Sequence, residues 1–416
     1  MITKQLQFMK RGAFLALVLV ALFSARSYAQ LSGAYTIGAG QTYPTIDSII
    51  KSLNTLGVSG AVTVNIPAGY TETTPVGGFK LGSTLLNASL SATNSLVFQK
   101  SGAGANPLIT GNTGIWLDAN VGSGQDVIWG FFGVDYVTID GIDIADNAAN
   151  TTITTANSYG YAFFKLNATL PLDGCNYNTV KNCTITLQRA INPYSAGIIM
   201  DGRVQTGSVL LLPGSVSDAD SYNKFYSNTI RNVGNGIFLR GYSNSIPKSL
   251  WDTNNDIGGS SGATGNNISS WGGTVASYGI YLTSQTNSSV RFNTVNNYNG
   301  GANSGVAATA GTHTAIFSQN GNIAYDDDIN LTLSNNNITL TNGVGSAALY
   351  GVYSYYQGGN MNINNNTITV ASTGLSTGAL YGVYYAYGAN AGAGVGKVSN
   401  CNNNIITGNY NCSTGA

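Results

Sequence analysis

An aspartate and an arginine end two copies of the same short apolar motif, and they are the strongest candidates for chemistry in this sequence. Asp201 follows Gly197-Ile-Ile-Met200, and Arg240 follows Gly236-Ile-Phe-Leu239. If both copies are strands on adjacent coils, the two side chains lie side by side on the outside, because side chains alternate between the faces of a strand. We therefore treat them as a candidate catalytic pair. The alternative is a surface ion pair worth about 0–1 kcal/mol.

The third position of the same motif is aromatic in five of its six copies. Alternation points this position outward too, two residues before the position of Asp201. Outward rings at regular spacing can stack on sugar rings, so we treat the five as candidate glycan-binding residues. Alternatively, loops cover them or the rings stabilise one another. They are Phe238, Tyr281, Phe317, Tyr353 and Tyr384.

The other candidates are isolated. Asp326, Asp327 and Asp328 could bind Ca²⁺ if they lie in a loop, although a solvated loop explains them equally simply. His313, the single histidine, could act as a general base, but no carboxylate stands near it in sequence. No Cys-x-x-Cys motif or histidine pair is present, so we predict no metal site and no cofactor apart from this possible Ca²⁺.

Two motifs alternate along the chain and must position these residues. The Gly-Ile-x-Leu motif starts at residues 197, 236, 279, 315, 351 and 382. Alternating motifs with loops of changing length predict stacked coils, each of which buries its apolar side against its neighbours. The asparagines would then form a ladder of amide hydrogen bonds along the stack. The second motif, Asn-x-Ile/Val, occurs at Asn228, Asn266, Asn293, Asn336, Asn366 and Asn403, with variants at Asp140 and Cys183.

Helical periodicity is convincing in one segment alone, residues 45–55, where apolar residues recur at helical spacing between Pro44 and Gly57. An alternating strand follows at residues 62–66. A single helix ahead of many strands can cover the open end of a stack of coils. Glycine (54 residues) and charged residues (8%) also argue against a long helical protein.

The repeats and the opening stretch, residues 35–72, resemble the right-handed parallel β-helix of the pectin-lyase-like superfamily, as found in secreted proteins of Bacteroidetes-type bacteria. The resemblance implies an all-β solenoid with one N-terminal capping helix. We place a cap region at residues 30–60 and the coils at residues 61–416. It further implies a role for Asp201 and Arg240, because polysaccharide lyases and pectin methylesterases of this fold use an Arg as base or oxyanion partner. The Asp then serves as metal ligand or nucleophile.

Residues 1–29 have the features of a secretory signal peptide. A basic start precedes an apolar run at residues 12–23, which is too short to span a bilayer, and small residues precede a cleavage site after Ala29. No other segment is long and apolar enough to cross a membrane. We therefore predict a secreted or cell-surface protein without a transmembrane segment after cleavage.

The charge of the chain limits which partners it can bind, and its cysteines limit which disulfides it can form. Residues 1–29 hold four of the 17 basic residues and no acid, which leaves 13 basic against 17 acidic residues and argues against nucleic acid. Four cysteines in a secreted chain permit disulfides, and spacing suggests Cys175–Cys183 and Cys401–Cys412, with free thiols as the alternative. The sequence ends at Ala416 without a polar cap, so we expect a fragment or a further domain.

Two functions remain open. The first is a non-catalytic β-solenoid that serves as a scaffold or binds a polysaccharide or cell-surface glycan, which the aromatic column and the few charges favour. The second is a polysaccharide lyase or glycoside hydrolase that uses Asp201 and Arg240, which the resemblance favours. Fold alone does not decide between them.

Overall fold

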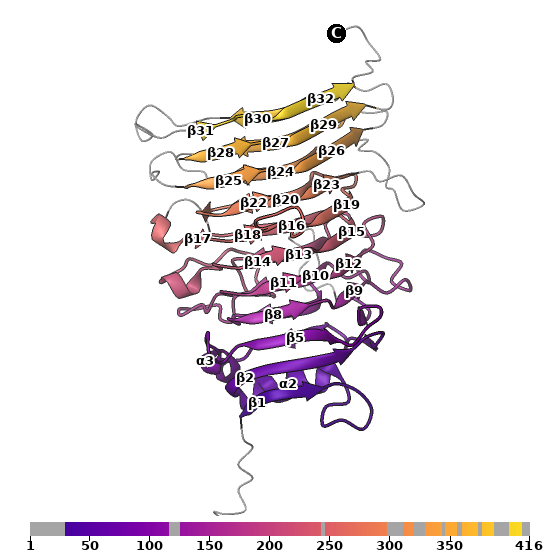
Figure 1. The fold of residues 1–416 in the computed structure, drawn as a ribbon, viewed down its shortest axis with the longest axis vertical. Helices are drawn as coiled ribbons and strands as arrows, with labels where there is room; N and C mark the ends of the chain where they lie inside the picture. The colour runs from indigo at the N-terminus through magenta and orange to yellow at the C-terminus, as the bar shows by residue number, and fades with distance from the viewer. Residues whose placement is uncertain are drawn as a thin grey trace, which may run out of the picture.

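The chain forms a right-handed parallel β-helix, as the repeats predict. The computed structural model describes residues 30–115, 125–242, 246–297, 311–319, 329–342, 346–355, 360–372, 377–386 and 399–409. Three parallel sheets run the length of the stack, with one strand of each sheet in nearly every coil (Figure 1). The predicted signal peptide, Asp326–Asp328 and Cys412 lie outside the described residues.

The first sheet has eleven strands and begins with β1, so the stack starts at Leu31 and includes part of the predicted cap region. Its strands are β1 (Leu31–Thr36), β2 (Val58–Pro67), β5 (Leu96–Ser101), β8 (Val137–Asp140), β11 (Thr179–Lys181), β14 (Lys224–Tyr226), β18 (Asp256–Ile257), β22 (Ser289–Arg291), β25 (Leu331–Ser334), β28 (Met361–Asn364) and β31 (Ser399–Asn400).

The second sheet carries the predicted site and has nine strands. They are β4 (Phe79–Leu81), β7 (Val127–Phe132), β10 (Tyr159–Phe164), β13 (Ala196–Asp201), β16 (Asn235–Arg240), β20 (Ser277–Thr283), β24 (His313–Gln319), β27 (Leu349–Tyr355) and β30 (Leu380–Ala386).

The third sheet has ten strands and faces the other side of the coil. They are β3 (Thr71–Thr73), β6 (Leu108–Thr110), β9 (Asp143–Ala145), β12 (Thr184–Thr186), β15 (Thr229–Val233), β19 (Asn267–Trp271), β23 (Thr294–Asn296), β26 (Asn337–Asn342), β29 (Thr367–Ser372) and β32 (Ile405–Asn409). A two-stranded sheet of β17 (Asp252–Thr253) and β21 (Gln285–Thr286) extends one corner.

The N-terminal end of the stack is covered by the predicted helix, α2 (Ile46–Leu56). Thr45 is its N-cap and accepts a hydrogen bond from the Ser48 backbone N–H. The single glutamate, Glu72, accepts from the backbone N–H groups of Ile46 and Asp47 at 2.8 and 3.2 Å, where a carboxylate also favours the helix dipole. A second short helix, α3 (Thr84–Ser89), was not predicted and packs against α2.

Inward columns of aliphatic residues fill the coils, and the predicted alternation is confirmed. Ile198, Ile237, Ile280, Ile316 and Val352 are in register and fully buried. In the last coil the expected inward position of Tyr385 is 36% exposed, because β30 is the outermost strand of its sheet.

The asparagine ladder is present and buried, with two corrections to its register. Each amide Nδ2 donates to the Oδ1 of the next rung at 2.8–3.1 Å. The last rung is Asn404 rather than Asn403, because this register puts Ile406 in the column of Ile368. Asp140 lies outside the ladder, since it pairs in register with Lys181 and forms an ion pair with it at 3.1 Å. The ladder residues are Asn228, Asn266, Asn293, Asn336, Asn366 and Asn404.

The suggested Cys175–Cys183 disulfide is wrong. Both thiols are free and buried, and they contact different groups: Cys175 lies 3.4 Å from the Phe164 carbonyl, and Cys183 lies 3.1 Å from the Lys181 carbonyl. The two residues stand on either side of β11, so a bond would have to cross the strand. Cys401 is an exposed free thiol.

Candidate functional site

The outer face of the second sheet carries an apolar cluster separate from the core. Alternation puts the odd residues of β13 outward, yet Ile199 and Asp201 are 3% and 0% exposed. Loops therefore cover this part of the face. The cluster comprises Val127, Tyr159, Ala162, Phe164, Ala196 and Ile199, with Phe132 and Phe238 packed against it.

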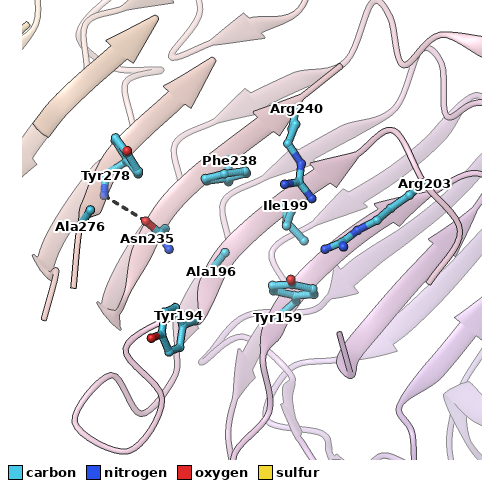
Figure 2. Close-up of a pocket in the computed structure, with 10 residues that line it drawn as sticks. All are labelled: Tyr159, Tyr194, Ala196, Ile199, Arg203, Asn235, Phe238, Arg240, Ala276 and Tyr278. Carbon is cyan, nitrogen blue, oxygen red and sulfur yellow. Dashed lines mark hydrogen bonds between the residues drawn. The ribbon is translucent and has the colours of Figure 1, made fainter. Parts of the chain in front are cut away.

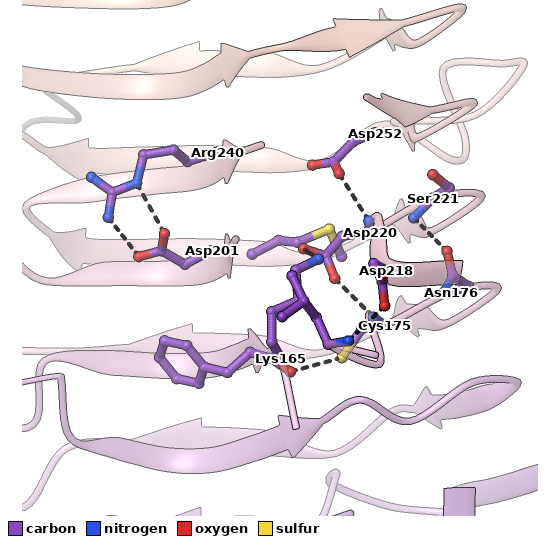
Figure 3. A network of polar contacts seen from close by, with 12 residues as sticks. Lys165, Cys175, Asn176, Asp201, Asp218, Asp220, Ser221, Arg240 and Asp252 are labelled. Carbon is purple, nitrogen blue, oxygen red and sulfur yellow. Dashed lines mark hydrogen bonds and ion pairs between the residues drawn. The ribbon is translucent and has the colours of Figure 1, made fainter. Parts of the chain in front are cut away.

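Asp201 and Arg240 lie on adjacent strands and bind each other through two hydrogen bonds (Figure 3). They are register partners in β13 and β16. Arg240 Nε donates to Asp201 Oδ1 at 2.9 Å, and Arg240 Nη2 donates to Oδ2 at 2.7 Å. This two-pronged geometry is the strongest form of an ion pair between side chains. Because the carboxylate is fully buried, the pair is not the surface ion pair considered as an alternative.

A second arginine, Arg203, completes the arrangement and was missed by the sequence reasoning. Its Nε donates to Asp201 Oδ2 at 2.7 Å, and its side chain is 3% exposed. Arg203 follows β13 after Gly202, outside the strand pattern, so no spacing signal pointed to it. The three side chains together carry one net positive charge.

The electrostatics make Arg240 a fixed cation and Asp201 an unsuitable nucleophile. Burial alone would lower the pKa of Arg240, but the Asp201 carboxylate outweighs it and raises that pKa above its usual value. A guanidinium with a raised pKa does not accept a proton as a general base. Asp201 has both oxygens occupied by arginines and no exposed surface. The arrangement therefore holds positive charge in place rather than transferring protons.

The two arginines line a pocket of about 230 Å³ on the outer face of the second sheet (Figure 2). Arg203 and Arg240 lie toward one end, and Tyr194 and Tyr278 lie toward the other. Asn235 accepts a hydrogen bond from the Tyr278 backbone N–H at 3.0 Å. The lining residues are Tyr159, Tyr194, Ala196, Ile199, Arg203, Asn235, Phe238, Arg240, Ala276 and Tyr278, with two cations and no carboxylate among them.

The predicted aromatic column is in register along the whole face. Its rings, however, contact one another. Phe238 and Tyr281 stack at 4.0 Å with an interplanar angle of 1°, and Tyr281 stacks on Phe317 at 5.1 Å. Tyr353 meets Phe317 and Tyr384 edge to face, at 5.3 and 5.0 Å. The rings therefore contact one another as the alternative expected, and the proposal that they bind glycan stays a prediction.

Exposure separates the members of this column. Phe317 is 8% exposed, so its ring is withdrawn from a ligand, whereas Phe238, Tyr281, Tyr353 and Tyr384 are half-buried. Burial also raises the pKa of Tyr281 to about 12. Phe238 alone among the five lines the pocket, and the Arg240 guanidinium carbon lies 5.9 Å from its ring centre.

A cluster of buried charges lies inside the coil near this site and was also missed (Figure 3). Lys165 Nζ binds Asp220 Oδ2 at 2.6 Å, with side chains that are 2% and 0% exposed. Asp252 Oδ1 accepts from the Asp220 backbone N–H, and burial raises the pKa of Asp252 to about 7. The cluster is enclosed, so it supports the fold rather than contacting a ligand.

The remaining predicted residues do not join the site. His313 is 1% exposed and burial lowers its pKa to about 4, so it is a neutral core residue. Within the described ranges, no group of histidine, cysteine, aspartate and glutamate side chains is arranged to hold a metal ion. Among those residues no helix is long and apolar enough to cross a membrane.

The similarity of this chain to known proteins is confined to solved structures. No protein-family model matches the chain, and no curated protein matches its sequence. The chain is similar to a GH136 lacto-N-biosidase from Eubacterium ramulus, with 10% identity and a TM-score of 0.45 over 85% of this chain and 67% of that one. It is also similar to an alginate lyase from Paenibacillus sp., with 15% identity and a TM-score of 0.30 over 85% and 98% of the chains. The class of this fold is a right-handed parallel β-helix, as the three parallel sheets themselves define it.

Proposed function

We propose that this protein is a secreted or cell-surface β-helix that binds an acidic glycan without cleaving it. The observation that carries the proposal is the pocket that two arginines and four aromatic residues line without any carboxylate. The Asp201 carboxylate holds both guanidinium groups by hydrogen bonds and neutralises one of their two positive charges. Ordered cations beside aromatic rings match a sugar that carries a carboxylate or a sulfate.

Binding is favoured over catalysis by the same geometry. A lyase would need a group that takes a proton, and a hydrolase would need paired carboxyl groups around the scissile bond. Arg240 stays protonated, and the carboxylate of Asp201 is enclosed by two arginines. The similar structures include a lacto-N-biosidase and an alginate lyase, whose names refer to carbohydrates. The proposal itself rests on the pocket.

The experiment compares two arginines. Arg240→Gln should weaken binding to soluble polygalacturonate by about tenfold or more, because a charge-assisted hydrogen bond contributes about 1.5–3 kcal/mol. Arg231→Gln is the matched control, since Arg231 is exposed on the third sheet and bonds Thr186 there. Binding is measured by isothermal titration, with thermal melts to verify folding. Equal effects of both substitutions would overturn the proposal. The wild-type protein should release neither unsaturated nor reducing ends from the polymer.

A further inference from the structure

The loop that follows Arg203 exposes an unusual number of aliphatic side chains. Residues 204–216 contain six aliphatic residues, one proline and no charged residue. Val209, Leu212 and Val216 are 65%, 52% and 68% exposed. Single exposed aliphatic residues are ordinary, but several on one loop of a charge-poor protein mark an interaction surface.

Hydrogen bonds fix the backbone at both ends of this loop, so its exposed apolar side chains stay in contact with solvent. The Leu211 N–H donates to the Gly202 carbonyl at 2.8 Å, and Gln205 Nε2 donates to the Gln125 carbonyl at 3.0 Å. At the far end, Asp218 Oδ2 accepts from the backbone N–H groups of Gly214 and Ser215, both at 3.0 Å.

A neighbouring loop adds a fourth aliphatic residue. Leu170 is 60% exposed and packs beside the same loop, since a Cβ atom on Gly214 would lie 2.9 Å from Leu170 Cδ2. We call Leu170, Val209, Leu212 and Val216 the aliphatic surface.

The loop that carries three members of the aliphatic surface is joined to the cationic pocket by Arg203. Arg203 lines the pocket, and its Nη1 donates to the Gly207 carbonyl of the loop at 3.4 Å. One short segment therefore carries both a positive charge held at a fixed place and a group of exposed aliphatic side chains.

The chemistry of this combination fits a lipid better than a protein. Protein interfaces are enriched in aromatic residues at their centres, whereas the four exposed members of the aliphatic surface are all leucine or valine. Surfaces that bind lipid combine apolar side chains, which enter the acyl region, with cations that contact anionic head groups. We infer that the aliphatic surface inserts into a lipid layer, and that the pocket takes an anionic head group of that layer. The head-group part rests on the proposed glycan site, so the complete ligand is an anionic glycolipid.

Vesicle co-sedimentation tests this inference. The purified protein should bind vesicles of phosphatidylcholine mixed with phosphatidylglycerol more tightly than vesicles of phosphatidylcholine alone. The double variant Val209→Ser/Leu212→Ser should reduce binding to the anionic vesicles by about tenfold or more, because transfer of an aliphatic side chain from water into the acyl region is favourable and transfer of a hydroxyl is not. The control is Val76→Ser/Leu85→Ser, which changes two aliphatic residues that are 64% and 48% exposed elsewhere.

The outcomes separate this inference from the proposed function. Val209→Ser/Leu212→Ser should leave polygalacturonate binding unchanged, because neither residue lines the pocket. Polygalacturonate binding without vesicle binding would overturn the lipid inference, leave the glycan proposal intact and point to a protein partner for the loop. Vesicle binding that both double variants weaken equally would also overturn it.

Discussion

Two regions of the same solenoid fill corresponding positions around the second sheet with different kinds of side chain. In the middle coils, residues 125–257, charged side chains are buried on both sides of the second sheet, as Lys165–Asp220 inside and Asp201–Arg240 outside show. In the described parts of the later coils, which lie between residues 266 and 409, the corresponding places hold amides, hydroxyls and aromatic rings. Asp252 pairs in register with Gln285, and Arg240 with Thr283.

The difference distinguishes positions that need charge from positions that do not. Amide ladders and stacked rings satisfy the coil without charge, as the later coils demonstrate. Buried charges carry a desolvation cost that well-packed neutral residues avoid. The middle coils retain them beside a pocket, so we interpret the outer charges as a binding device.

The largest effect is expected inside the middle coils. Lys165→Met should lower the free energy of unfolding by about 3–5 kcal/mol, because it leaves the buried Asp220 carboxylate without its partner. Lys181→Met, which breaks the more exposed pair with Asp140, should cost less than about 1 kcal/mol. Urea denaturation measures both. Similar values for the two variants would show that buried charge does not distinguish this region.

Acid should act on the later coils through His313. Asn297 Nδ2 donates to His313 Nδ1, and His313 Nε2–H donates to the Gly273 carbonyl, so the folded state holds the neutral ring. Its folded pKa of about 4 lies below the unfolded value of about 6.5, so the unfolded chain takes up the proton first as pH falls. This contribution is complete above pH ~6.5 and decreases toward pH ~4, by about 3 kcal/mol at most. His313→Gln should flatten this part of the stability profile, and an unchanged profile would contradict the assignment.

A moderate effect is expected in the amide ladder. Asn336 donates to the Val290 carbonyl and to Asn366 Oδ1, and its own Oδ1 accepts from Asn293. Asn336→Ala should lower the free energy of unfolding by about 1–3 kcal/mol, because buried polar groups lose their partners. Asn337→Ala, at an exposed position of β26 outside the ladder, is the control in the same denaturation experiment. A larger loss at Asn337 would argue against the ladder.

The smallest effect is expected in the aromatic column, where one member lines the pocket and the others do not. Phe238→Ala should weaken polygalacturonate binding by up to about tenfold, because Phe238 lines the pocket. Tyr353→Ala, in the same column but outside the pocket, should leave the dissociation constant unchanged within about twofold. Equal losses at both positions would extend the site along the whole column.

The coils could be predicted from the sequence because their signals are local and repeated. Period-two alternation gave the inward column of Ile198 and the register of Asp201 with Arg240. The predicted ladder was wrong at its ends. The run Asn402-Asn403-Asn404 is compatible with two registers, and the one that forms is set by the packing of Ile406. The cysteines were misjudged because eight residues span a whole strand with its two corners.

The site could be predicted only in part, since its other members lie outside the repeat. Lys165 directly follows β10 and Arg203 lies two residues after β13, in positions where charged side chains are normally solvated. Their burial depends on loops from other coils, as the contact of Lys165 with Asp220 shows. No pattern in the sequence encodes such contacts between distant residues.

The most direct test of the central claim compares polygalacturonate with its methyl-esterified form, in which the carboxylates are neutral. The account predicts that wild-type protein binds the acidic polymer at least about tenfold more tightly. Arg240→Gln should lose most of this preference while remaining folded at the temperature of the binding measurement, since Arg203 still pairs with Asp201. Equal affinity of the wild-type protein for both polymers, or release of unsaturated ends from either, would contradict the account.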